Sequence, residues 1–132
     1  MASTLVAAAT AEPIDAFPAD PSGVVIQDRL YDTFEIGGKS FEIYAVIYAK
    51  GEGDSFVDIY SGDPGVTGMD WKKLHTWPIP KGPNDINVLN STESEGHIQF
   101  ISTSWFIYDE GRALPVLDYN PKTGAFEESL VD

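Results

Sequence analysis

The segment 40–50 constrains the fold most strongly, because it is apolar on both faces of an extended chain. Successive side chains of a strand point to opposite faces. One face would carry Phe41, Ile43, Ala45 and Ile47, and the other Glu42, Tyr44, Val46 and Tyr48. A strand that is apolar on both faces needs a packed layer on each side. We therefore expect 40–50 to be a central strand covered on both faces.

Short β-prone runs occupy much of the remaining chain, at a spacing of about ten residues. They are 24–27, 31–36, 56–60, 71–77, 86–89, 98–108, 114–119 and 125–130. Gly- and Pro-containing segments such as Gly37-Gly38 separate them, and these residues favour turns because Gly accepts positive φ and Pro presets φ. No window of useful length shows a sustained helical period. The sequence predicts an all-β domain, an antiparallel β-sandwich or barrel of about eight strands.

Residues 1–23 differ in composition from the β-domain that we expect over 24–132. They contain no Lys or Arg, an Ala-rich start, and prolines at positions 13, 18 and 21. Pro disfavours a long helix, so we expect an extended N-terminal arm. Three interpretations of a specific role remain open: a mature secreted protein restarted at Met, a truncated export signal, or an arm that docks on a partner. The plainest expectation is a mobile tail whose removal leaves the stability of the β-domain nearly unchanged, because chain termini are commonly loose. The small residues at the start are typical of a signal-cleavage region and favour a secreted or periplasmic protein.

Charge and cysteine content exclude several classes of function. The 132 residues carry 21 acidic and 8 basic side chains, a net charge of −13, and no cysteine. Nucleic acids and anionic membranes attract basic proteins, so we expect neither as a partner. The absence of Cys excludes disulfide scaffolds, thiol nucleophiles and thiolate metal sites.

Residues 61–71 carry a local motif. The matching positions are Ser61, Asp63, Gly65 and Thr67, followed by Trp71. This pattern resembles the Asp-box hairpin of sialidase-type and other BNR-repeat proteins, Ser-x-Asp-x-Gly-x-Thr followed by an aromatic residue, although Gly68 stands where the aromatic belongs. The resemblance implies a structural turn in which Asp63 accepts hydrogen bonds from turn amides. It implies no activity, and no family resemblance extends over the whole chain.

The inventory of reactive side chains argues against catalysis. His75 and His97 are the only histidines, and we interpret both as ordinary surface residues. A ribonuclease-like His–Glu pair with Arg112 is conceivable, but the acidic surface would repel RNA. The oxygen donors between 85 and 93 do not match a calcium loop, because Val88 and Leu89 replace ligands there. We expect no enzyme activity, no cofactor and no metal. Asn90-Ser91-Thr92 is an N-glycosylation triplet, meaningful only in a eukaryotic secretory pathway.

Aromatic side chains next to acidic ones are the features most typical of binding. Exposed Tyr and Trp suit a protein partner or a sugar ring, because they supply contact area with little loss of entropy. The segment 77–83 contains three prolines, so we expect a stiff exposed loop there with Trp77 as an anchor. The predicted binding residues are Tyr44, Tyr48, Tyr60, Trp77, Glu93, Glu95 and Trp105.

These observations favour a non-catalytic, acidic interaction protein. We expect its partner to be another protein with a basic surface, because a negative surface accelerates encounter with a positive one. An inhibitor, an immunity-like protein, a nucleic-acid mimic and an accessory subunit all fit. Two alternatives remain open: a carbohydrate-binding module with Tyr and Trp platforms, and a structural subunit of a large assembly, such as a virion, tethered by the N-terminal arm.

Overall fold

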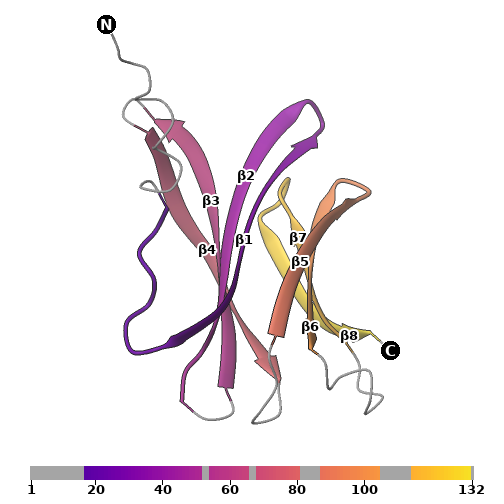
Figure 1. Cartoon of the computed structure of the whole chain (residues 1–132). Helices are drawn as coiled ribbons and strands as arrows, with labels where there is room; N and C mark the ends of the chain where they lie inside the picture. The colour runs from indigo at the N-terminus through magenta and orange to yellow at the C-terminus, as the bar shows by residue number, and fades with distance from the viewer. Residues whose placement is uncertain (1–16, 52–53, 66–67, 81–86, 105–113, 132) are drawn as a thin grey trace, which may run out of the picture.

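A computed structural model describes residues 17–51, 54–65, 68–80, 87–104 and 114–131. It confirms the all-β fold: eight strands form two four-stranded antiparallel sheets that pack together as a sandwich (Figure 1). Within the described ranges there is no helix that is long and apolar enough to cross a membrane.

Each sheet is a meander in which strands adjacent in sequence pair with each other. Sheet A, indigo to pink in Figure 1, contains β1 (Val25–Ile36), β2 (Lys39–Ala49), β3 (Asp54–Gly65) and β4 (Gly68–Pro80). Sheet B, orange to yellow, contains β5 (Asn87–Ser94), β6 (His97–Ser104), β7 (Leu114–Asn120) and β8 (Ala125–Val131).

Strand β2 is covered on both faces, as its sequence predicts. Its inner side chains, Ile43, Ala45 and Ile47, are fully buried in the core between the sheets. That core also contains residues from both sheets, among them Val57, Ile59, Trp77, Leu89, Ile98, Phe100 and Leu117. The outer side chains of β2, Tyr44, Val46 and Tyr48, form a second buried cluster on the outer face of sheet A.

Side chains join the two sheets along both edges. Where β1 meets β5, the Asp28 carboxylate accepts a hydrogen bond from the Leu89 amide at 2.9 Å, and the Ser91 hydroxyl donates to Asp32 at 3.1 Å. At the other edge, the His75 ring on β4 stacks on Phe126 of β8, with centroids 4.4 Å apart. Each of these contacts runs from an edge strand of sheet A to an edge strand of sheet B, so they hold the two sheets together.

Three strands differ from the sequence expectation. The runs 24–27 and 31–36, expected to be two strands, form the single strand β1. A register shift between Ile26 and Asp28 lets its pairing with β2 continue across the gap. Strand β6 ends at Ser104, and residues 105–108 of its expected span lie outside the described part. Strand β4 continues to Pro80, because an edge strand tolerates Pro, which has no amide hydrogen to donate to the ladder.

The predicted turn at 61–67 is the largest correction. The hairpin itself exists, but Ser61, Asp63 and Gly65 lie within β3, and Trp71 lies in β4. Asp63 lies opposite Asp70, and pairing continues to Gly65 opposite Gly68. The ladder therefore occupies positions that the motif would assign to a loop. Thr67 lies outside the described residues.

Candidate functional site

The predicted binding tyrosines gather on the outer face of sheet A. Tyr44 lies opposite Tyr60 on the neighbouring strand, and Tyr48 lies opposite Phe56. Tyr44 and Tyr48, however, are only 3% and 7% exposed, so the prediction of an open aromatic platform is wrong for both. Tyr60 is half-buried at the edge of the same cluster.

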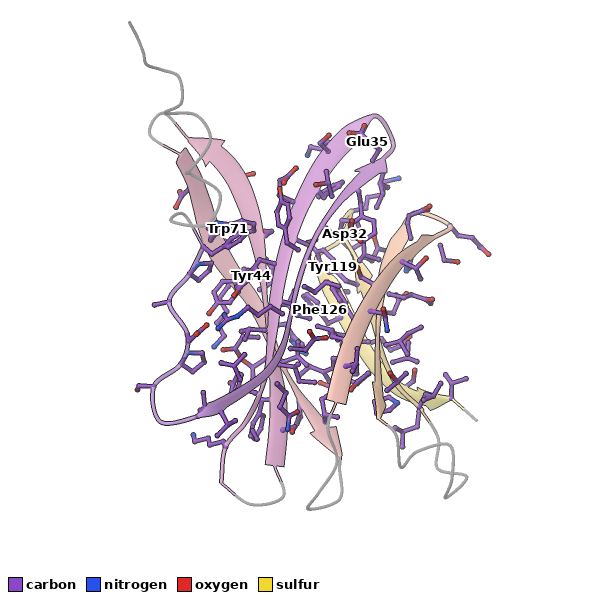
Figure 2. The ribbon with its side chains drawn as sticks, in the orientation of Figure 1. Asp32, Glu35, Tyr44, Trp71, Tyr119 and Phe126 are labelled. Atoms are coloured by element: carbon purple, nitrogen blue, oxygen red, sulfur yellow. The ribbon has the colours of Figure 1, made fainter. Side chains whose placement is uncertain are left out.

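Residues 17–24, which we call the arm segment, cover this face, so the expectation of a mobile tail is wrong for these residues. The Phe17 ring stacks on Tyr44 with centroids 4.6 Å apart and an interplanar angle of 11°. It also contacts Tyr31 and Trp71 at centroid distances of 5.4 and 5.6 Å. We call these three side chains, Tyr31, Tyr44 and Trp71, the aromatic cradle. Figure 2 shows Tyr44 and Trp71 next to each other on the side of sheet A along which the arm segment runs.

An ion pair fixes the arm segment next to the cradle. Both terminal nitrogens of Arg29 donate to the Asp20 carboxylate, at 2.6 and 2.7 Å, and Nη1 also donates to the Tyr44 hydroxyl at 2.9 Å. The hydrogen bond from Arg29 lowers the pKa of Asp20. The hydrogen bonds to Asp20 and Tyr44 raise the pKa of Arg29. Asp20 and the cradle are thus linked through a single guanidinium group.

The cradle contains a polar atom that its surroundings do not satisfy. Nε1 of Trp71 is buried and has no hydrogen-bond partner in the structure. Tyr31, on the rim, is 49% exposed, and its hydroxyl donates to Glu42. A buried indole N–H without an acceptor destabilises the packing around it, because it has lost its hydrogen bonds to water.

Acidic side chains face one another across two hairpins. Asp63 lies opposite Asp70 in the β3–β4 ladder, and both are exposed. Asp118 lies opposite Glu127 in the β7–β8 ladder. Like charges directly opposite each other in a sheet are destabilising. Next to the second pair, His97 Nδ1 lies 2.7 Å from Asp118 Oδ2.

Glu93 and Glu95 are exposed on the β5–β6 hairpin, where the sequence placed an acidic loop. The Glu93 carboxylate accepts a hydrogen bond from the Gly96 amide at 2.9 Å. Glu95 has a φ of 51°, in the left-handed region that is uncommon outside Gly, Asn and Asp. Its side chain therefore projects from a strained turn residue.

Trp77 and Trp105 are the two tryptophans that the sequence predicts to take part in binding. Trp77 is 2% exposed and lies in the core between the sheets, so its prediction as the anchor of an exposed loop is wrong. In β4, Trp77 and Ile79 point inward whereas Pro78 is exposed. Trp105 lies outside the described residues.

A cleft of about 560 Å³ opens between three hairpin turns at one end of the sandwich. Lys39, Lys122 and Glu95 line it, together with Phe41 and His97. Its lining carries charges of both signs. Among the described residues, no group of three or more His, Cys, Asp or Glu side chains could hold a metal ion.

No family model, curated protein or solved structure matches this chain. The site is therefore defined by its own geometry. Sequence reasoning missed Phe17, Asp20, Arg29 and Tyr31 as members of it. One signal could have indicated the arm contact: Phe17 is the only aromatic residue among the first 23, and an acidic residue follows it three positions later.

Proposed function

We propose that this protein is a non-catalytic binding protein whose acidic surface docks on a basic surface of another protein. The observation that carries the proposal is the pairing of acid with acid across a ladder, Asp63 opposite Asp70. No basic side chain among the described residues forms an ion pair with either carboxylate. Such a pair costs about 0.2–1 kcal/mol, and a cationic group on a partner would turn the repulsion into attraction.

The exposed acids of the β5–β6 hairpin support the same function. Glu93 lies near the end of β5 and Glu95 in the tight turn that follows, and the Glu93 carboxylate accepts a hydrogen bond from the Gly96 amide of that turn. A rigid turn presents charge with little ordering on binding, which favours fast electrostatic association. An inhibitor, an immunity-like protein and an accessory subunit all use such a surface.

The carbohydrate alternative loses its main support. It depended on an exposed aromatic platform, and Tyr44, Tyr48 and Trp77 are all buried. The assembly alternative depends on the N-terminal arm, and the described part of that arm, residues 17–23, packs on its own domain.

The test begins with capture of the partner from native extract and elution in a salt gradient, followed by mass spectrometry. Association and dissociation rates are then measured across salt concentrations. We expect the association rate to fall steeply between low and physiological salt, because exposed charges are screened beyond a Debye length of about 8 Å. A salt-independent association rate would contradict the proposal.

A matched pair of variants locates the binding face. Glu93→Gln with Glu95→Gln removes two charges from the β5–β6 hairpin, and Glu127→Gln with Glu128→Gln removes two from β8. We expect the first pair to slow association more than the second, because the β5–β6 turn projects its charges. Equal slowing would mean that only net charge matters.

A further inference from the structure

The arm segment is bound to its own domain in the way a peptide ligand is bound. Among the described residues, side chains alone hold it, because the β1–β2 ladder begins only at Val25 opposite Ala49. Phe17 fills the aromatic cradle and Asp20 pairs with Arg29. An aromatic ring followed three residues later by a carboxylate therefore makes both main contacts.

The chain next to this ligand can act as a hinge. Gly23 has a φ of 74° and is exposed, and nothing lies within 4 Å of the position a Cβ would occupy there. A change of backbone angles at Gly23 would move residues 17–22 without breaking any pair of the β1–β2 ladder. Pro18 and Pro21 restrict the arm itself, which reduces the entropy lost when it docks elsewhere.

We propose that the cradle and Arg29 accept Phe17 and Asp20 from a second copy of this chain, so that two copies exchange arms. The second copy is the indicated occupant because it carries the ligand that this cradle already fits. The exchanged contacts are identical to the internal ones, as in domain swapping, and reciprocal exchange gives a closed two-fold dimer. A short tether gives the internal arm an effective concentration on the order of mM, so the closed monomer dominates in dilute solution.

The salt dependence of exchange is opposite to that of the proposed function. Two copies with a charge of −13 each repel one another, and added salt screens this repulsion. Exchange is therefore favoured at higher salt, whereas binding to a basic partner is weakened. The salt dependence of dimer formation therefore tests arm exchange, and the salt dependence of partner binding tests the proposed function, so either can fail without the other.

A charge-swap experiment tests the exchange. In full-length chains, Asp20→Arg makes the arm repel its own Arg29, and Arg29→Asp makes the other copy's arm repel its own sheet. When the two variants are mixed, each arm meets an opposite charge only on the other copy. We expect the equimolar mixture to form a 1:1 dimer, measured by size-exclusion chromatography with light scattering, in a larger fraction than either variant alone.

The double variant Asp20→Arg/Arg29→Asp is the matched control, because it restores the internal pair. At the same dilute concentration we expect it to be mostly monomeric, like the original protein. Circular dichroism and thermal melting confirm that each variant is folded. A mixture of folded variants that stays monomeric would overturn the proposal. A dimer that persists when both members also carry Phe17→Ala would overturn it as well, since the cradle would not be the interface.

Discussion

The Tyr48 hydroxyl donates a hydrogen bond to the buried Asp58 carboxylate at 3.1 Å, on the outer face of sheet A. The same carboxylate oxygen accepts a hydrogen bond from Thr76 at 2.8 Å, and Lys73 Nζ lies 3.5 Å from the other oxygen. A buried charge is tolerated only when it is paired and hydrogen-bonded. Side chains of β2, β3 and β4 therefore meet at the Asp58 carboxylate, next to the buried cluster on the outer face of sheet A.

This arrangement predicts a loss of stability in alkali. Burial, followed by the charge of Asp58, raises the pKa of Tyr48 from 10.0 to about 12. Because the folded-state pKa is the higher one, the stabilisation is fully present below about pH 10 and is lost as the pH rises through about 12. We expect the free energy of unfolding, measured by urea denaturation, to fall across this window.

The variant Tyr48→Phe checks the assignment. It should lower stability at neutral pH by about 1–3 kcal/mol, because Asp58 loses a donor. It should also make the alkaline decline shallower, though not flat, because burial or neighbouring groups also raise the pKa of Tyr31, Tyr60 and Tyr119. An unchanged alkaline slope would assign the decline to the other tyrosines.

Trp77→Ala should destabilise the fold severely, by about 3–5 kcal/mol, because it leaves a large cavity between the sheets. Trp71→Ala is the matched control. Trp71 is only half-buried, so we expect a smaller loss. Denaturant unfolding of both variants provides the measurement. A small loss at Trp77 would restore the interpretation of 77–83 as an exposed loop.

Asp63→Asn should stabilise the protein by about 0.2–1 kcal/mol, because it removes the repulsion with Asp70. The gain should shrink at high salt. Adding Asp70→Asn should bring little more, since one change already breaks the pair. An Asp-box turn predicts the reverse, a loss of about 1–3 kcal/mol when an acceptor of turn amides is removed. The sign of the change in chemical denaturation distinguishes the two interpretations.

The strands could be predicted from sequence because their signal is local. The apolar residues on both faces of 40–50 were sufficient to identify β2 and to predict that both of its faces are covered. The prolines of 77–83 misled the prediction. A proline favours a loop in sequence, and only pairing with β3 shows that Pro78 and Pro80 lie in an edge strand. The aromatic cradle was harder still to predict, because it forms only when β1, β2 and β4 lie in the correct register. Tyr31 lies opposite Tyr44, and Trp71 reaches them from β4, so no single stretch of sequence contains the site.

Glu95 has a strained backbone conformation and carries an exposed negative charge. Two substitutions separate the effects of these two properties. Glu95 and Gly96 have φ values of 51° and 84° between the paired residues Ser94 and His97. Positive φ at both central residues is the geometry of a type I′ turn, which favours Asn or Asp at the first position. Glu95→Asn and Glu95→Asp should therefore each stabilise the protein by about 1 kcal/mol, the order of the penalty for a left-handed residue.

Only Glu95→Asn removes the charge. We expect it to slow association with a basic partner, whereas Glu95→Asp should keep the original rate. Thermal melting measures the first effect, and binding kinetics at low salt measure the second. If neither variant raises the melting temperature, the turn is not strained. If both variants associate at the same rate, the charge at position 95 takes no part in binding.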